Sequence, residues 1–142
     1  MILKDLLRDS GEVFTLTVND RIRDAMEIMH RQSVGSVVIT DEDKVVGIIT
    51  DRDVALGVTL GAATAESFVG EVMSREVHTI DQSASMFDAA RKFREARVQR
   101  LPVVDEKDQL VGLISSDDMT AVLARELVNT CSVIEGRLHQ AV

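Results

Sequence analysis

The sequence has few of the features that mark secreted or membrane-spanning chains. Its one cysteine, Cys131, cannot form a disulfide within the chain, which is typical of a reducing compartment. No apolar run approaches the roughly 18 residues of a spanning helix. The charged start MILKDLLRDS also lacks the apolar segment of a signal peptide. We therefore expect a cytoplasmic protein that does not enter a membrane.

Basic residues are in the minority, with 16 Lys and Arg against 24 Asp and Glu and a formal net charge of −8. A surface of this sign repels nucleic acid and anionic membranes, so we expect neither as a partner. The three histidines are scattered, and none has the spacing of metal ligands or lies in a nucleophile–base arrangement. The sequence therefore predicts no catalytic residues, no metal site and no required cofactor.

The 142-residue chain, 45% hydrophobic, contains an internal duplication. DAMEIMHRQSVGSVVITD at 24–41 aligns with DAARKFREARVQRLPVVD at 88–105. KVVGIITDRDV at 44–54 then aligns with QLVGLISSDDM at 109–119. A copy of about 60 residues is too small to bury a sufficient core alone, so we expect the two copies to form one pseudo-symmetric module.

Each copy changes its hydrophobic period in the same order. Apolar residues first recur at helical spacing: Ile22, Ala25, Met26 and Met29 in copy one, and Met86, Ala89, Ala90 and Phe93 in copy two. Two short β-branched stretches separated by a charged turn follow, and a second helix is expected from about Asp51 and about Ser116. The sequence predicts an α/β (α+β) fold of two helix-strand-strand-helix repeats whose sheets pack against each other.

The chain also offers signals for its division into units. The small-residue stretch 61–65 is the expected linker, and 68–73 is expected to form a short helix before copy two. Beyond Met119, the stretch AVLARELVNTCSVIEGRLHQ has no Pro and one Gly, which predicts a long C-terminal helix. We therefore expect a first repeat at 1–62 and a second repeat, with the C-terminal helix, at 63–142.

One motif occurs in both copies, as GIITDRD at 47–53 and GLISSDD at 112–118. Thr50 and Ser115 stand where a strand ends and a helix begins, so their hydroxyls and the first backbone N–H groups favour an anion such as phosphate. Three residues later, Asp53 and Asp118 offer two acceptor oxygens that suit the adjacent hydroxyls of a ribose. Phosphate and ribose together indicate a nucleotide.

The same residues have a purely structural interpretation. A hydroxyl followed three residues later by an acid is close to the capping box of ordinary helices, and an acid in the first turn complements the helix dipole. Capping accounts for the hydroxyl and the acid. It does not account for Gly47 and Gly112, which would allow a backbone or a ligand to approach closely, or for the repetition of the whole unit.

The paired motifs, the strand phrases GSVVITD and QRLPVVDEKDQLVG and the lead-in VGEVMSREVHTI together resemble the cystathionine β-synthase (CBS) domain family. The resemblance extends from about Ile2 to about Leu127. It implies a sheet-packed pair with two clefts that bind adenosine-containing ligands such as AMP, ADP, ATP, S-adenosylmethionine or NAD. It also implies a homodimer.

The resemblance assigns roles residue by residue. It implies that Asp53 and Asp118 bind ribose, and that Thr50 and Ser115 lie nearer the phosphate. It also implies a set of residues around the phosphates and the base, namely Arg100, which matches a phosphate-binding basic residue, the backbone beside Thr17 and Thr79, and the apolar Val37, Val38, Leu101 and Pro102. Copy one has Gly35 and Ser36 where copy two has Gln99 and Arg100, and carries Arg52 inside its motif. Either arginine can equally be solvated or paired with nearby acids.

Two functions remain open on this basis. The favoured one is a regulatory module that senses AMP, ADP or ATP in clefts between the repeats and signals to a partner protein. The alternative is a ligand-free dimerisation or scaffold module whose motifs are only helix caps. Apolar residues on consecutive turns near the end of each copy are candidate dimer contacts: Val54, Val58, Leu60, Leu123, Leu127 and Val128.

Overall fold

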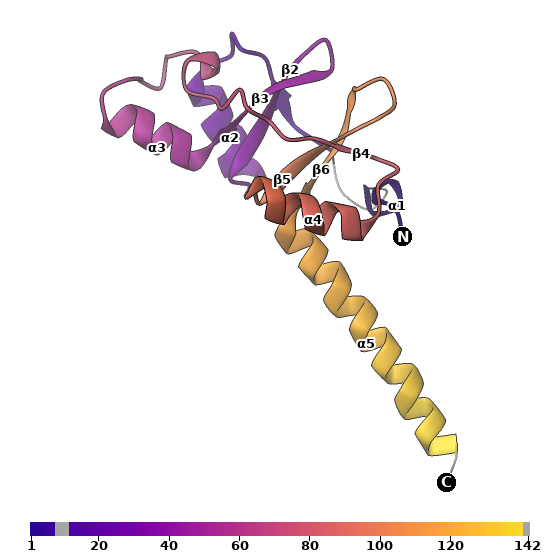
Figure 1. Ribbon diagram of the computed structural model, residues 1–142. Coiled ribbons are helices and arrows are strands. Elements are labelled where there is room, and N and C mark those ends of the chain that lie inside the picture. Colours follow the sequence, from indigo (N-terminus) through magenta and orange to yellow (C-terminus); the bar gives the residue numbers. More distant parts are fainter. Residues whose placement is uncertain (8–11, 141–142) are drawn as a thin grey trace.

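Two three-stranded sheets, one from each repeat, form the centre of the molecule (Figure 1). The structure is a computed structural model that describes residues 1–7 and 12–140. In chain order the elements are α1 (Leu3–Leu7), β1 (Thr15–Leu16), α2 (Ile22–Gln32), β2 (Ser36–Asp41), β3 (Lys44–Thr50), α3 (Asp51–Thr59), the 3₁₀ helix η1 (Val69–Glu71), β4 (Ile80–Asp81), α4 (Met86–Ala96), β5 (Arg100–Val104), β6 (Leu110–Ser115) and α5 (Ser116–Gln140). The predicted fold class is confirmed.

The sheets repeat one topology in one register. Their strand orders are β1-β2-β3 and β4-β5-β6, with the first pair parallel and the second antiparallel. Ser36 pairs with Thr50 as Arg100 pairs with Ser115, and both hairpins have a register shift at the same place along the middle strand. The short strands β1 and β4 add a third strand to each sheet, which the predicted order of elements did not include.

Helices α2 and α4 each cover one face of a sheet with the apolar residues of the duplicated stretch. Ile22, Ala25 and Met29 are buried on α2, as are Met86, Ala89 and Phe93 on α4. Met26 and Ala90 were predicted to share these faces, but both are exposed. The buried faces are therefore narrower than the sequence pattern suggested.

The segment that precedes each repeat packs into the core of the other repeat. Leu3 of α1 is fully buried in the second core, and its backbone N–H donates to Ala84 O at 2.9 Å. Val69 of η1 and Met73 are buried in the first core, although they follow it in sequence. Both sheets thus depend on residues from across the predicted boundary at residue 62, and the division into 1–62 and 63–142 stays a prediction.

The motif glycines lie under these crossing segments. A Cβ on Gly47 would stand 2.5 Å from Met73 Sδ and 3.0 Å from Ser74 O, and a Cβ on Gly112 would stand 2.5 Å from Leu7 Cδ2. Real Cβ atoms do not approach other atoms so closely. Both glycines were predicted to allow a backbone or a ligand to approach closely. In the structure, the group that approaches each glycine is a neighbouring segment of the chain.

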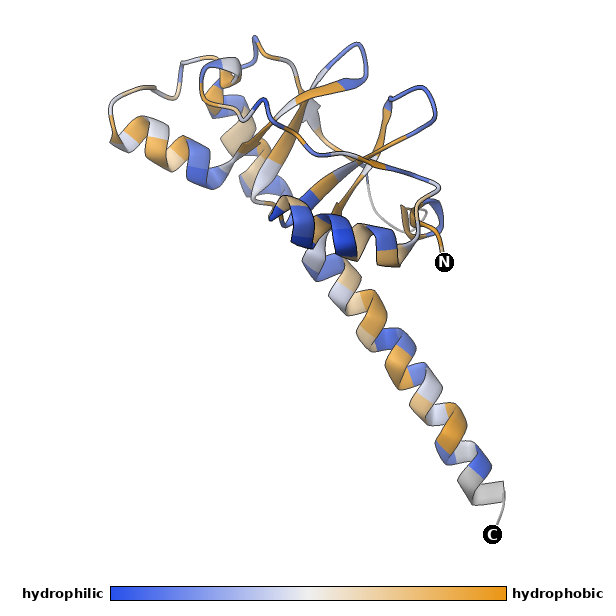
Figure 2. Ribbon diagram, viewed as in Figure 1, coloured by the Kyte–Doolittle hydropathy of each residue, from blue (hydrophilic) through white to orange (hydrophobic). Residues whose placement is uncertain are grey.

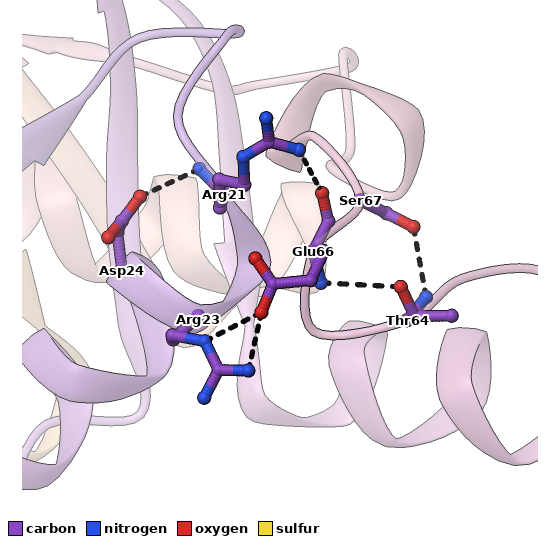
Figure 3. A network of polar contacts seen from close by, with 6 residues as sticks. All are labelled: Arg21, Arg23, Asp24, Thr64, Glu66 and Ser67. Carbon is purple, nitrogen blue, oxygen red and sulfur yellow. Dashed lines mark hydrogen bonds and ion pairs between the residues drawn. The ribbon is translucent and has the colours of Figure 1, made fainter.

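A polar network fixes residues 64–69, between the two repeats, to the start of α2 (Figure 3). Arg23 Nε donates to Glu66 Oε1 at 2.8 Å, and Arg21 donates to the backbone carbonyl of Glu66. The hydrogen bond and charge of Glu66 raise the pKa of Arg23 above its ordinary value. The backbone follows the same path, since Ile22 N–H donates to Ser67 O at 2.9 Å and Val69 N–H donates to Asp20 O at 2.8 Å. The segment that directly follows the predicted linker is therefore held at the start of α2.

The sheets pack against each other through the faces that the helices leave free. Val38 lies in the middle strand of the first sheet and Pro102 in that of the second, and both are almost completely buried. Neither belongs to a helix-covered core, whereas the alternate residues Val37 and Leu101 do. The hairpins also meet at their tips, where Leu110 N–H donates to Asp43 O at 2.9 Å.

Helix α5 begins at the second sheet and projects from the molecule (Figure 1). Near its start, Met119 is buried and Val122 packs against the second core. From Leu123 to Arg137 every residue is exposed, including Leu127 at 65% and Ile134 at 53%, and apolar residues recur along the projecting part (Figure 2). The predicted C-terminal helix is confirmed, and no helix in the described residues is both long and apolar enough to cross a membrane.

Candidate functional site

A cleft of about 320 Å³ opens where the second motif meets the start of both middle strands. Residues of four segments line it, namely 12–14, 33–36, 99–100 and 113–118. The first two segments belong to repeat one and the last two to repeat two. The cleft is therefore composite, although its motif comes from the second repeat alone.

The structure brings three of the predicted site residues together in this cleft: Arg100, Ser115 and Asp118. Thr50, Arg52 and Asp53 of the first motif do not line it. Their assignment as a second site stays a prediction.

The residues expected to enclose the base lie elsewhere. Val38 and Pro102 are buried between the sheets, so their side chains offer almost no surface to a ligand. The Thr17 N–H donates to Asp20 Oδ2 at 2.7 Å, and Thr79 lines a separate hollow beside α4. The apolar lining of the cleft comes from other residues, which the sequence prediction missed: Val13, Phe14, Val34 and Leu113. No local sequence pattern marked Val13 and Phe14, because they precede the two-residue strand β1, whose parallel pairing with β2 aligns this segment with the middle strand.

Both motifs form the capping box that was their alternative interpretation. Asp53 N–H donates to Thr50 Oγ1 at 3.1 Å, and Thr50 N–H donates to Asp53 Oδ2 at 2.9 Å. The second motif has the same two bonds at 3.0 Å between Ser115 and Asp118. In each aspartate only Oδ2 takes part, and within the described residues Oδ1 accepts no hydrogen bond. Capping and ligand binding are thus compatible in one carboxylate.

Helix α4 provides a matched example of the same cap without the motif. Ser85 N–H donates to Asp88 Oδ2 at 3.0 Å, and Asp88 N–H donates to Ser85 Oγ at 3.1 Å. Hydrogen bonds from the Ser85 side chain and backbone lower the pKa of the Asp88 carboxyl. Asp88 does not line the cleft, so it separates the effect of a cap from that of a binding residue.

The two motif helices differ in the donors that they leave free. At the start of α3, Asp51 N–H donates to Gly35 O at 3.1 Å and Arg52 N–H donates to Asp51 Oδ1 at 2.8 Å. Together with the capping box, these bonds occupy each backbone N–H from 50 to 53, so the free N–H groups predicted for this helix are not there.

At the start of α5, Ser116 N–H donates to Gln99 O at 2.9 Å, but Asp117 N–H has no acceptor within the described residues. Because Asp117 lines the cleft, only the second motif offers a free helix N–H to an anion there.

Ser36 and Arg100 occupy equivalent positions in the two repeats and line the same cleft. Ser36 is 4% exposed, and its Oγ has no hydrogen-bond partner within the described residues. Buried hydroxyls are normally hydrogen-bonded, and leaving one without a partner costs about 1–3 kcal/mol. The sequence identified Ser36 only as the counterpart of Arg100, and the structure makes it a polar residue of the composite cleft.

Arg100 extends toward the first repeat. Its Nη2 lies 3.2 Å from the point that a Cβ on Gly35 would occupy, and Asp51 Oδ2 lies 3.4 Å from the same point. A guanidinium of the second repeat therefore stands near a carboxylate of the first motif. The absence of a side chain at Gly35 leaves room for this arrangement.

The sequence matches one family model twice, the CBS domain, at residues 3–58 and 69–125. The chain belongs to the CBS domain family. A curated relative, the CBS domain-containing protein YhcV of Bacillus subtilis, is 32% identical over 108 residues, which are 76% of each chain. Two CBS domains thus account for most of the sequence, and the outer part of α5 lies beyond them.

Other comparisons match part of a longer chain and a solved structure with bound ligands. The inosine-5′-monophosphate dehydrogenase of Methanocaldococcus jannaschii is 32% identical over 76% of this chain, but the match spans only 21% of that enzyme. Among solved structures, the CBS domain pair of protein MJ0100 has a TM-score of 0.77 at 28% identity, covering 89% of this chain and 98% of that one. That structure is a complex with 5′-methylthioadenosine and S-adenosyl-L-methionine.

Proposed function

We propose that this CBS domain pair is a regulatory module that binds an adenosine-containing ligand in the composite cleft and signals to a partner protein. The observation that carries the proposal is that two unused polar groups lie at one cleft, the Oδ1 of Asp118 and the N–H of Asp117, with the unpartnered hydroxyl of Ser36 buried in the wall of the same cleft. A carboxylate suits the ribose hydroxyls, and the helix N–H and Arg100 suit an anionic group. The ligands of MJ0100 support the adenosine part of the proposal.

The cleft also has an apolar side suited to a base. Val13 and Phe14 precede β1, Val34 precedes β2, and Leu113 lies on β6. Sites for small molecules typically combine such apolar lining with a few placed polar groups. In the arrangement that uses each side of the cleft, adenine would pack against the apolar residues. The ribose would bind Asp118, and the 5′ substituent would lie near Arg100.

We propose further that the pair acts without a catalytic step of its own, as a homodimer. The function then lies in the change of stability or shape that the ligand produces, and the partner is the protein whose activity follows that change. AMP, ADP, ATP, S-adenosylmethionine and NAD all share the adenosine that the cleft would recognise.

The competing function is a ligand-free scaffold, and one observation favours it for the first motif. Every backbone N–H from 50 to 53 is already hydrogen-bonded, so capping alone accounts for Thr50 and Asp53. If this motif also binds a ligand, we expect its phosphate contact to come from the side chain of Arg52, which is exposed.

Calorimetric titration and thermal unfolding with the five adenosine compounds test the proposal. A ligand at a hundredfold excess over its dissociation constant stabilises the native state by about 2.7 kcal/mol, so the melting temperature should rise measurably with at least one compound. If none of the five produces heat or a thermal shift, the ligand-binding function is wrong and the scaffold function takes its place.

A further inference from the structure

The composite cleft contains more negative than positive side chains. Among the described residues that line it, Arg100 is the one basic residue, whereas three are carboxylates: Glu12, Asp117 and Asp118. They come from both repeats, so the imbalance does not depend on one helix. A ligand that brings several negative charges into this cleft meets like charges on more than one side.

A carboxylate of the first repeat lies near Arg100. Its Nη2 and the Oδ2 of Asp51 lie within 3.2 Å and 3.4 Å of one point beside Gly35. Asp51 is therefore a further carboxylate near the guanidinium, although it does not line the cleft. In the described part of the chain, the charged groups that line the cleft or lie beside Arg100 are thus one guanidinium and four carboxylates.

The remaining polar groups of the cleft are neutral. The N–H of Asp117 is at the start of α5, where the helix dipole contributes about half a positive charge. The hydroxyl of Ser36 donates or accepts a hydrogen bond without adding charge. These groups, with Arg100, match one compact polar substituent rather than a chain of phosphates.

We propose that the cleft selects adenosine ligands by charge, accepting those with a neutral, cationic or monophosphate 5′ substituent and disfavouring nucleoside polyphosphates. This inference rests on the proposed function and narrows its ligand class. Because a like charge nearby in a solvated cleft weakens binding roughly threefold, ATP should bind about tenfold more weakly than AMP, with ADP between them.

The test is calorimetric titration of the full chain with adenosine, 5′-methylthioadenosine, AMP, ADP and ATP, at low ionic strength and without divalent cations. Asp117→Asn and Glu12→Gln each remove one cleft charge, and Asp117→Asn keeps the backbone N–H. Each variant should reduce the AMP-to-ATP affinity ratio by about threefold. Glu106→Gln, in the exposed turn between β5 and β6, removes the same charge outside the cleft and should leave the ratio unchanged.

Raising the ionic strength gives an independent test. It should lower the AMP-to-ATP affinity ratio, because screening weakens the repulsion of ATP more than that of AMP. If ATP binds as tightly as AMP or more tightly, or if the two cleft variants leave the ratio unchanged, charge selection is wrong while the proposed function stands. If none of these compounds binds, the proposed function fails and the charge selection fails with it.

Discussion

Met73 lies directly over Gly47, with its Sδ 2.5 Å from the position that a Cβ on residue 47 would take. The contact joins a strand of the first sheet to the segment that leads into the second. Two backbone hydrogen bonds accompany it, from Ile48 N–H to Ser74 O at 3.0 Å and from Ser74 N–H to Ile48 O at 2.9 Å. The glycine of the first motif is thus required by the packing of the chain upon itself.

The first prediction follows from this contact. Gly47→Ala should lower the free energy of unfolding by about 1–3 kcal/mol, because neither Met73 nor the carbonyl of Ser74 has room for a methyl group. Gly136→Ala is the matched control, since a Cβ there meets nothing within 4 Å and alanine favours the helix. Chemical denaturation measures both. A Gly47→Ala variant as stable as the natural chain would contradict the contact.

The second prediction separates ligand binding from capping at Asp118. Asp118→Asn should abolish binding of adenosine compounds while lowering the melting temperature only slightly, because Asn still accepts the capping hydrogen bond. Asp88→Asn alters the equivalent capping box on α4 outside the cleft, where the carboxylate also accepts from Ser85 Oγ and pairs with Arg91. This variant should cost at least as much stability without affecting binding. If calorimetry shows that both variants bind as tightly as the natural chain, Asp118 has a capping role only.

The third prediction concerns Arg100. A hydrogen bond between a guanidinium and a phosphate contributes about 1.5–3 kcal/mol, so Arg100→Ala should weaken AMP binding by roughly tenfold to a hundredfold and leave adenosine binding unchanged. Arg52→Ala removes an exposed arginine that does not line the cleft and should change neither affinity in it. Equal losses for adenosine and AMP would instead indicate that Arg100 supports the fold.

The fourth prediction is a homodimer that uses the exposed apolar residues of α5. Leu123, Leu127 and Val128 are 49%, 65% and 63% exposed, whereas Val54, also proposed as a contact, is buried in the first core and is unavailable. Light scattering should give twice the chain mass of 15.6 kDa. Leu127→Glu should shift this toward the single-chain mass, and Asn129→Glu, a neighbouring polar position, should not. A single-chain mass for the natural protein at micromolar concentration would exclude the dimer.

Local patterns in the sequence predicted the fold well, because the duplication repeats helical and strand periods in one order. The errors lie where distant residues decide the outcome. Met26 has the spacing of a core residue, yet the sheet covers only the face that holds Ile22, Ala25 and Met29. Strands β1 and β4 have two residues each, too few to carry a period, and they exist because the middle strand offers a parallel edge.

The candidate site was predictable in its motif and not in its surroundings. Ser115 and Asp118 follow from a local strand-to-helix pattern, and the structure places both at the cleft. Val38 was expected at the base because it is apolar and near the motif, but packing between the two sheets buries its side chain. Ser36 and Phe14 come from the other repeat, so their approach depends on how the two repeats pack, which no local pattern encodes.

Helix α5 starts in the cleft, where Asp117 and Asp118 form its first turn, and ends far outside the globular part of the molecule (Figure 1). At 1.5 Å per residue its 25 residues make a rod about 37 Å long. Its contacts with the second core come from Met119 and Val122, close to its first turn. A tilt of about 5° at the cleft would therefore displace the far end by about 3 Å. Under the proposed function, the helix would act as a lever that turns a small change at the ligand into a larger displacement at its far end, where it would meet a partner protein.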